Sequence, residues 1–324
     1  MMNVLITGGA GFIGSNLAAY HLEKGDSVYV VDNLSTGSIR NIVTLQHNPS
    51  FQFAEADIVL WNNLNDVVSW ADRIYHMAAV VGVKKVLEDP RAVMAINISG
   101  TERIFRSVAA VHPQAQVTIA SSSEVYGFNN NACFSETDDI VLRSGARLRW
   151  CYAITKLADE FLAYSFMYKS GINVVIARLF NTIGFHQTGK YGMVVPNLIG
   201  QAVRNQPLTV FGDGTQTRSF CDVRDMVVAL DLLASTPAAN GEIVNVGNDA
   251  EISILDLAKL ILQRAKSSSE IKYLSYIEAY GMDIDEIIRR RPVLTKLNSL
   301  TGFKAKWSLT ETLDSLIALE RHNV

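Results

Sequence analysis

Two groups of residues have the types and spacing that proton transfer requires. The first is Tyr152 and Lys156, which lie four positions apart in CYAITKLADEF, a segment with helical periodicity. On a helix this spacing places both side chains on one face, where the lysine ammonium would stabilise a phenolate and lower the pKa of the tyrosine. Such a tyrosine can remove a proton from an alcohol hydroxyl. A YxxxK pair alone is common on helix surfaces, so the interpretation depends on its surroundings.

The second group follows an apolar, strand-like run. In AQVTIASSSEVYGF three serines and Glu124 come directly after the apolar residues. A simple turn needs only one or two small polar residues. Ser122, Ser123 and Glu124 are therefore candidates for contacting a reacting ligand. The alternative for Glu124 is a carboxylate that caps the turn or orients a lysine or arginine.

The elements that would position these residues alternate between strands and helices. The expected strands are the apolar runs at 3–9, 27–33, 50–58, 73–79, 115–123 and 173–181. Helical segments between them predict an α/β fold with a doubly wound, parallel Rossmann sheet. Ligands of such sheets bind beyond the carboxyl ends of the strands, which is where residues 121–124 would lie.

A glycine-rich segment, ITGGAGFIGSNLA, joins the first strand to the first helix. Gly8, Gly11 and Gly14 allow a tight turn and a close approach of the backbone to a pyrophosphate at the helix N-terminus. Asp32 ends the second strand, where its carboxylate can accept hydrogen bonds from ribose hydroxyls and would repel a 2′-phosphate. The sequence therefore predicts NAD as the cofactor, in preference to NADP.

Asp57 and Ile58 follow the third strand and could lie at the edge of the adenine ring. The alternative is that Asp57 belongs to a turn and Ile58 to the hydrophobic core. The candidate cofactor contacts are Gly8, Gly11, Phe12, Ile13, Gly14, Asp32, Asn33, Asp57, Ile58, Ala78, Ala79, Tyr152 and Lys156.

The second half of the chain is less regular and predicts a second, smaller α/β domain. We expect an NAD-binding domain at 1–181 plus about 217–246. The C-terminal substrate-binding domain would take about 182–216 and 247–324.

Composition narrows the classes of protein. The chain of 324 residues is 48% apolar and 19% charged, with a net charge of −3. This balance argues against a general nucleic-acid binder. Cys133, Cys151 and Cys221 are widely spaced and predict no metal site. A cytoplasmic setting is the default for such cysteine usage, and no run approaches the ~20 apolar residues of a membrane span.

These motifs together resemble the extended short-chain dehydrogenase/reductase family, in its nucleotide-sugar epimerase/dehydratase branch. The resemblance covers nearly the whole chain. It rests on TGGAGFIG, VDNLSTG, HMAA, SSSEVYG, YAITK, ARLFNTIG, GMVVP, LTVFGDGTQTRSF and RRRPVLTKL. It implies an enzyme that uses tightly held NAD to oxidise a nucleotide sugar transiently at carbon 4. It also implies Ser122, Tyr152 and Lys156 as the catalytic triad, and a mainly structural role for Asn97.

The resemblance further implies contacts with the nucleotide sugar, which it implies to be UDP-linked. Asn181 would contact the diphosphate or the sugar, and Val195 and Phe211 lie in segments that would pass beside the nucleotide and its base. Arg218 and Arg290 would bind the diphosphate, with a substrate carboxylate as a second possibility for Arg218. Guanidinium groups suit both kinds of anion. The choice among Arg289, Arg290 and Arg291 stays open.

The residues after Ser122 bear on the reaction. In 4,6-dehydratases the resembling pattern is Asp then Glu, whereas this chain has Ser123 and Glu124. The sequence SEVYG resembles UDP-glucuronate decarboxylases, in which oxidation at carbon 4 would produce a β-keto acid that loses carbon dioxide. Residues 80–90 are closer to the epimerases, and Phe185, His186 and Val293 depart from the decarboxylase pattern.

UDP-glucuronate decarboxylation is therefore the preferred hypothesis. The alternative is 4-epimerisation of UDP-glucose, UDP-glucuronate or a UDP-N-acetylhexosamine, and a non-catalytic NAD-binding sensor or scaffold is the alternative from another class. The resemblance also implies a homodimer through helices at 92–111 and 151–171, although packing inside one subunit would give similar apolar stripes.

Overall fold

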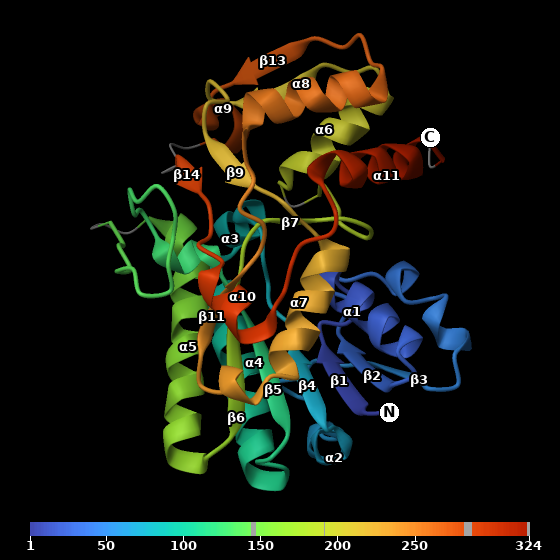
Figure 1. Ribbon diagram of the computed structural model, residues 1–324, viewed down its shortest axis with the longest axis vertical. Coiled ribbons are helices and arrows are strands. Elements are labelled where there is room, and N and C mark those ends of the chain that lie inside the picture. The colour runs from blue at the N-terminus through green and yellow to red at the C-terminus, as the bar shows by residue number, and fades with distance from the viewer. Residues whose placement is uncertain (144–146, 191, 282–286, 323–324) are drawn as a thin grey trace.

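The computed structural model describes residues 1–143, 147–190, 192–281 and 287–322. It has a large lobe built on a parallel sheet and a smaller cap over one end of that sheet (Figure 1). Among the described residues, no helix has the length and apolar character needed to cross a membrane.

The large lobe contains β1 (Asn3–Thr7), α1 (Phe12–Glu23), β2 (Ser27–Asp32), β3 (Phe51–Glu55), α2 (Leu64–Trp70), β4 (Arg73–His76), α3 (Val83–Glu88), α4 (Pro90–Val111), β5 (Gln116–Ser122), α5 (Cys151–Ser170), β6 (Asn173–Leu179), α7 (Val223–Ala234), β11 (Ile243–Val246) and α10 (Thr295–Thr301). The cap contains α6 (Val194–Val203), β8 (Leu208–Phe211), β9 (Thr217–Ser219), β12 (Glu251–Ser253), α8 (Ile254–Ala265), β13 (Ile271–Leu274), α9 (Tyr276–Tyr280), β14 (Arg289–Arg290) and α11 (Leu309–His322). The pair β7 (Thr182–Ile183) and β10 (Cys221–Asp222) lies where the lobes meet.

The central sheet has the strand order β11-β6-β5-β4-β1-β2-β3, and every neighbouring pair is parallel. The chain turns to opposite sides of β1, first through β2 and β3 and then through β4, β5 and β6. This order confirms the predicted doubly wound α/β fold, and it creates a crevice beyond the carboxyl ends of β1 and β4.

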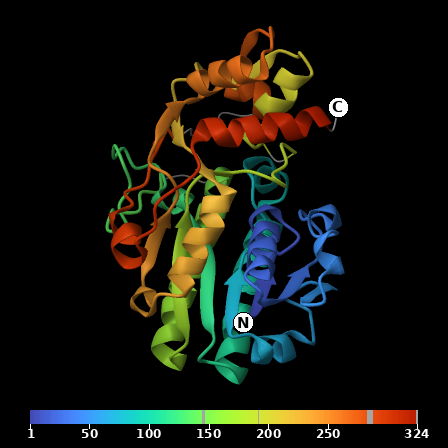
Figure 2. The same cartoon turned by 45° about the vertical axis from the view of Figure 1, so that its right-hand side comes forward.

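Helices cover both faces of the sheet, which is why its strands are almost continuously apolar. On β1, Val4 and Ile6 belong to the core under α1, α7 and α10, whereas Leu5 belongs to the core under α2, α4 and α5. This alternation is the two-residue period of a strand. Figure 2 shows α7 and α1 in front of the sheet and the cap across its upper end.

The cap has its own core between α6, α8, α11 and its short strands. Leu198, Leu257, Ile261 and Leu313 are fully or almost fully buried there. Its strands form a sheet of order β12-β9-β14 and a separate parallel pair, β13-β8.

One segment does not follow the expected division of the chain. Leu297 of α10 and Phe303 after it belong to the core of the large lobe, although the sequence suggests a substrate domain throughout 247–324. The apolar side chains of α10 pack on α7 and β11, so the chain returns to the large lobe before α11. We retain the two-domain division as a proposal, with this return segment added.

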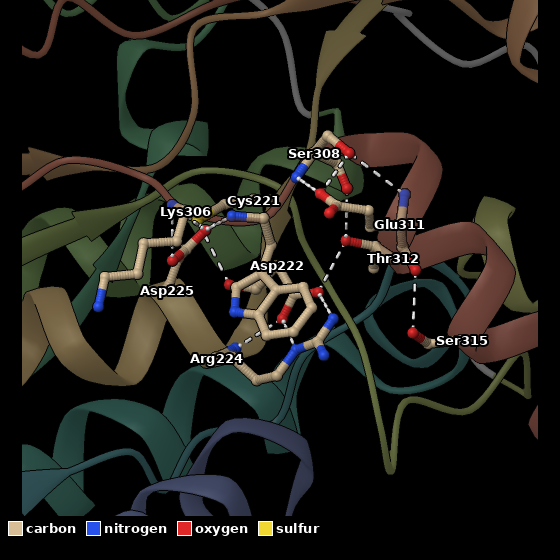
Figure 3. A network of polar contacts seen from close by, with 10 residues as sticks. Cys221, Asp222, Arg224, Asp225, Lys306, Ser308, Glu311, Thr312 and Ser315 are labelled. Carbon is tan, nitrogen blue, oxygen red and sulfur yellow. Dashed lines mark hydrogen bonds and ion pairs between the residues drawn. The ribbon is translucent and has the colours of Figure 1, made fainter.

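A polar network fixes the start of α11 to the start of α7 (Figure 3). Asp222 accepts hydrogen bonds from the Arg224 side chain at 2.6 and 2.9 Å and from the Thr312 hydroxyl at 2.7 Å. Asp225 accepts the backbone N–H groups of Lys306 and Trp307. The guanidinium of Arg224 also lies 3.3 Å from the centre of the Trp307 ring, which is within the range of a cation–π contact. These contacts set the position of α11 relative to the sheet.

A second buried network lies at the opposite end of the sheet. Asp231 of α7 binds Arg73 of β4 at 2.6 Å and Lys24 at 2.5 Å, and it accepts a hydrogen bond from the Tyr20 hydroxyl at 3.1 Å. Arg73 and Asp231 are both almost completely buried. Removing one partner of such a pair leaves a buried charge uncompensated.

Asp231→Ala should therefore lower the free energy of unfolding by about 3–5 kcal/mol, because Arg73 loses its carboxylate partner. Urea unfolding followed by circular dichroism measures the change. The matched control is Asp249→Ala, at an exposed position, which should leave the unfolding curve in place. Equal curves for the two variants would show that the network adds no stability.

Candidate active site

A cavity of about 830 Å³ lies where the carboxyl ends of the strands meet the cap. All predicted catalytic residues line it: Ser122, Ser123, Glu124, Tyr152 and Lys156. So do all predicted cofactor contacts from Gly8 to Ala79, together with Asn181 and Arg290. Its volume lies in the upper part of the range usual for small-molecule sites.

Three predicted substrate contacts lie elsewhere. Val195 is only 1% exposed and belongs to the apolar core of the cap, so its side chain is unsuited to nucleotide binding. Phe211 ends β8 and packs edge-on against Tyr276, with ring centroids 6.4 Å apart. Arg218 lies on β9 beside Arg290 of β14 and influences the site through its charge. The resemblance implied nucleotide contacts for Val195 and Phe211, whereas their side chains pack within the cap.

The glycine-rich turn after β1 is shaped for close contact with a ligand. Gly8 has a φ of +69°, and a Cβ at this position would lie 2.6 Å from the nitrogen of Ala78. A Cβ at Gly14 would lie 2.3 Å from the carbonyl oxygen of Gly8. Only glycine fits both places. The turn therefore leads directly into the N-terminus of α1, where N–H groups can bind a pyrophosphate.

Asp32 ends β2 with its carboxylate held by the backbone. It accepts N–H groups from Ala10 at 3.0 Å and from Leu34 at 2.8 Å. Burial raises the pKa of Asp32, and these hydrogen bonds oppose that shift. Each oxygen keeps acceptor capacity for a ribose hydroxyl. With the glycine turn, this acceptor fits a dinucleotide.

The adenine end of the cavity is formed by Asp57, Ile58 and Asn33. The amide of Asn33 donates to the Asp57 carboxylate at 3.2 Å. Ile58 is 9% exposed and packs against Gly100 of α4. A Cβ added at Gly100 would lie 3.2 Å from Cδ1 of Ile58. Ile58 thus serves the core and also lines the cavity.

Tyr152 and Lys156 both face the cavity from α5. Burial raises the pKa of Tyr152 well above its usual range, and the charges of Glu124 and Asp159 raise it further. The Ser122 hydroxyl and Arg290 act in the opposite direction. Burial therefore outweighs the groups that favour the phenolate, and the effect expected of the Lys156 ammonium on Tyr152 stays a prediction. Lys156 is bound by Asp159, at 3.2 Å.

Glu124 is held between arginines. Its Oε1 accepts a hydrogen bond from Arg290 at 3.0 Å and lies 3.8 Å from Nη2 of Arg149. Burial by itself would raise the pKa of Glu124, but Arg290, Arg149 and Arg218 outweigh it and lower the pKa. Glu124 is therefore an ionised carboxylate at neutral pH.

Local structure explains how Glu124 and Arg149 meet. Residues Ser123–Tyr126 form a 3₁₀ turn at the end of β5, capped by the Ser122 hydroxyl, which accepts the N–H of Glu124 at 3.2 Å. A second 3₁₀ turn, Leu148–Trp150, leads into α5 and carries Arg149. The sequence analysis missed Arg149. The sequence does contain an indication of its role, because Arg149 lies three residues before Tyr152 and therefore one turn earlier on the same face.

Two further sets of contacts hold this end of the sheet in place. Ser121 donates to Glu160 at 2.5 Å, and Arg178 binds the same carboxylate at 2.9 and 2.7 Å. Asn97 binds both backbone groups of Val80 and donates to the Thr155 hydroxyl at 3.1 Å. These contacts fit the structural role inferred for Asn97, and they make Ser121 a supporting residue.

A loop from the cap side closes over α1. The ring of His186 lies 2.9 Å from the hydroxyl of Ser15, and Asn16 donates to the carbonyl of Phe185 at 3.0 Å. His186 lines the cavity with a φ of +71°. Burial lowers its pKa, so the imidazole is neutral at pH 7. The sequence marked this residue only as a departure from a pattern.

Comparisons with known proteins agree with this architecture. The model of a family described as GDP-mannose 4,6 dehydratase matches residues 5–316. A UDP-N-acetyl-alpha-D-glucosaminuronate decarboxylase from Bacillus cytotoxicus is 36% identical over 97% of this chain and 96% of its own length. The UDP-glucuronic acid decarboxylase 4 of Arabidopsis thaliana is 32% identical over 100% of this chain and 70% of its own.

A solved structure is similar over its whole length. It is a UDP-glucuronic acid 4-epimerase from Bacillus cereus in complex with UDP-glucuronic acid and NAD. It is 27% identical, has a TM-score of 0.89, and is matched over 100% of both chains.

Gly14→Ala should weaken NAD binding by at least about tenfold, equivalent to about 1.4 kcal/mol, because the new methyl group would displace the Gly8 carbonyl and reshape the turn. Isothermal titration calorimetry with NAD measures the loss. Gly171→Ala is the control, since a Cβ there meets nothing within 4 Å although its φ is also positive. It should cost some stability and leave the NAD affinity unchanged. Equal affinities in the two variants would contradict the predicted cofactor turn.

Proposed function

We propose that this chain, which belongs to the family described as GDP-mannose 4,6 dehydratase among the extended short-chain dehydrogenases/reductases, is an NAD-dependent decarboxylase of a UDP-linked uronic acid. UDP-glucuronate is the first candidate substrate. UDP-N-acetylglucosaminuronate is the second, because a relative similar over nearly the whole chain carries that name. Both sugars present a carboxylate on carbon 5 that becomes β to a ketone once carbon 4 is oxidised.

The observation that carries the proposal is the pair of buried arginines beside Tyr152. Arg149 and Arg290 are each 8% exposed and line the cavity next to Ser122 and Glu124. Guanidinium groups bind carboxylates with two parallel hydrogen bonds, and such bonds are strong where water is excluded. A sugar whose carbon-4 hydroxyl reaches Tyr152 would have its carbon-5 carboxylate near these arginines.

The side chains would divide the chemistry as follows. NAD, when bound, accepts the hydride from carbon 4 and later returns it. The phenolate of Tyr152 takes the proton of the carbon-4 hydroxyl, and the Ser122 hydroxyl binds the same oxygen. The bond from carbon 5 to the carboxylate then breaks, its electron pair moves toward the carbon-4 carbonyl, and carbon dioxide leaves. Carbon 5 takes a proton from water, which leaves a 4-keto pentose. Return of the hydride to carbon 4 and of the proton from Tyr152 to the carbon-4 oxygen then gives a UDP-pentose and restores the phenolate.

Glu124 takes a more limited role in this proposal than the sequence suggested. An ionised carboxylate is a poor proton donor, and the pKa of Glu124 is held low by its arginines. We assign it to orienting Arg290 and Arg149, the alternative that the sequence left open. Ser123, which is 2% exposed, is assigned to the wall of the cavity.

A second candidate is 4-epimerisation. It is favoured by the similarity to an epimerase crystallised with UDP-glucuronic acid. Epimerisation uses the same oxidation and the same Tyr152, but the ketone must turn over while the carboxylate stays attached. The anion-binding arginines suit either outcome, so the product decides between them.

The test is a 13C NMR time course of the protein with NAD and UDP-glucuronate labelled in the carboxylate. UDP-N-acetylglucosaminuronate, UDP-glucose and UDP-N-acetylglucosamine run in parallel. We expect the carboxylate signal to disappear as carbon dioxide forms, with a UDP-pentose in its place. Tyr152→Phe should slow this by about 10²–10⁴-fold.

Two other outcomes would overturn the decarboxylase proposal. Carbon-4 epimers with an intact carboxylate or hydroxymethyl group would establish an epimerase. Tight NAD binding with no turnover of any of the four sugars, in both the wild type and Tyr152→Phe, would favour the sensor.

We also propose that the protein is a cytoplasmic homodimer. Helices α4 and α5 pack together at one side of the large lobe (Figure 1). The outer face of α5 exposes large apolar rings: Phe161 is 66% exposed, Tyr164 40% and Tyr168 84%. A second copy of these two helices would bury that surface in a four-helix interface. The cytoplasmic location is supported by the free thiols of Cys133, Cys151 and Cys221, because cytoplasmic proteins keep their cysteines reduced.

Phe161→Glu should convert the dimer into a monomer, because it places a charge in the centre of the apolar interface. Light scattering after size-exclusion chromatography at micromolar concentration measures the mass. Tyr273→Glu is the matched control, at an aromatic residue of the cap that is 52% exposed, and it should stay dimeric. A wild-type monomer would overturn the homodimer proposal.

A further inference from the structure

The catalytic lysine has a charged partner that neither the sequence motifs nor the proposed chemistry explains. Nζ of Lys156 lies 3.2 Å from Oδ2 of Asp159, three residues further along α5. Lys156 is 3% exposed and Asp159 is 1% exposed. The other oxygen of Asp159, Oδ1, is buried and has no hydrogen-bond partner within the described part of the chain.

Such a carboxylate is an unusual structural element. A buried ion pair stabilises a fold only when its remaining acceptors are satisfied, and replacing it with apolar groups is often neutral. The Oδ1 atom of Asp159 has no hydrogen-bond partner among the described residues, although the Thr101 hydroxyl lowers the pKa of the carboxylate. Its Oδ2 atom binds the ammonium of Lys156, the lysine of the YxxxK pair. A buried pair of this kind is weak evidence for a stabilising role.

Other charged and titratable groups lie around the pair. The groups that face Asp159, Lys156 or Tyr152 are His76 of β4, Glu124 after β5, Glu160 of α5 and Arg290 of β14, with the hydroxyls of Thr101 and Ser122. His76 contributes no positive charge at neutral pH, because burial lowers its pKa to about 3. Its ring is held between the hydroxyls of Thr7, at 2.7 Å, and Thr101, at 3.1 Å.

Glu160 is also accounted for, since Arg178 binds both of its oxygens. Glu124 is bound by Arg290, at 3.0 Å. Among the described residues, the carboxylate in direct contact with Lys156 is therefore that of Asp159.

We infer that Asp159 is a positioning residue of the catalytic site: its buried carboxylate binds the Lys156 ammonium and thereby limits how much of that positive charge acts on the Tyr152 phenol. Asp159 has no role in contacting the substrate. It acts through Lys156 and through its own negative charge, and together these set the pH at which Tyr152 can serve as a base. The inference rests on the proposed role of Tyr152 as that base.

The direction of the effect follows from the charges. Burial raises the pKa of Tyr152 most, the charge of Glu124 raises it next, and the carboxylate of Asp159 raises it further. Burial raises the pKa of Asp159 itself, and Lys156 opposes this. Removing the negative charge of Asp159 would free the ammonium to stabilise the phenolate. The pKa of Tyr152 would then fall, and the phenolate would form at lower pH.

The first experiment measures the rate against pH for the wild type, Asp159→Asn and Asp159→Glu with saturating NAD. In Asp159→Asn the rise of the rate with pH should move to lower pH by about one unit, the low end of the effect of a nearby charge. Asp159→Glu keeps the charge and should keep a midpoint close to that of the wild type. Asp159→Ala repeats the charge removal if the Asn variant does not fold.

The second experiment needs no substrate. Tyrosinate absorbance of the NAD-bound protein is titrated for each variant, and the curve of the same variant carrying Tyr152→Phe is subtracted. The difference isolates Tyr152 among the 11 tyrosines. We expect the titration of Tyr152 to move to lower pH in Asp159→Asn by the same amount as the rate profile.

The control is Asp225→Asn, at another buried carboxylate, which binds the backbone of Lys306 and Trp307 far from Tyr152 in the sequence. It should lower stability and leave the titration of Tyr152 in place. The inference would be overturned if Asp159→Asn folds and loses rate at every pH while the midpoints of its rate profile and of its tyrosinate titration stay at the wild-type values. Asp159 would then be a structural residue. Full turnover by Tyr152→Phe would instead overturn the role of Tyr152, and so separates the two failures.

Discussion

The ion pair between Glu124 and Arg290 is the contact on which the rest of the site depends. It joins the 3₁₀ turn after β5 to the short strand β14 across 166 residues of sequence. Because a buried carboxylate needs a partner, the hydrogen bond from Arg290 lets the C-terminal segment help to hold the turn that carries Ser122 and Ser123. The large lobe and the cap therefore meet at this cavity through a shared charge pair.

The surrounding contacts convert that pair into a rigid arrangement. Ser121, Glu160 and Arg178 bind the end of β5 to α5 and β6, and Asn97 binds the loop after β4 to Thr155 of α5. Groups held by several hydrogen bonds lose little entropy when a ligand arrives, which is the physical meaning of preorganisation. The cofactor turn is rigid for a different reason, since its glycines leave no space for side chains.

Local features of the sequence were enough to predict the fold, the glycine turn, Asp32 and the faces of α5 that carry Tyr152 and Lys156. Each depends on residues close together in the chain. The partners of those residues could not be predicted in the same way. Arg149 meets Glu124 only because two 3₁₀ turns approach each other. The pairing of Lys156 with Asp159 depends on burial of both groups, and the apolar residues of α10 gave no sign of which lobe they would join.

The order in which the two cores are closed has a consequence for synthesis of the chain. The edge strand β11 (Ile243–Val246) and then Leu297 of α10 complete the large lobe, while Leu313 and Ile317 of α11 complete the cap (Figure 1). A nascent chain on the ribosome therefore keeps apolar surface of the large lobe uncovered until α10 has emerged, and apolar surface of the cap uncovered until α11 has emerged. Chains that stop short of α11 would leave Leu198, Leu257 and Ile261 without the apolar residues of α11 that pack on them. We expect chaperones and proteases to recognise such incompletely folded chains.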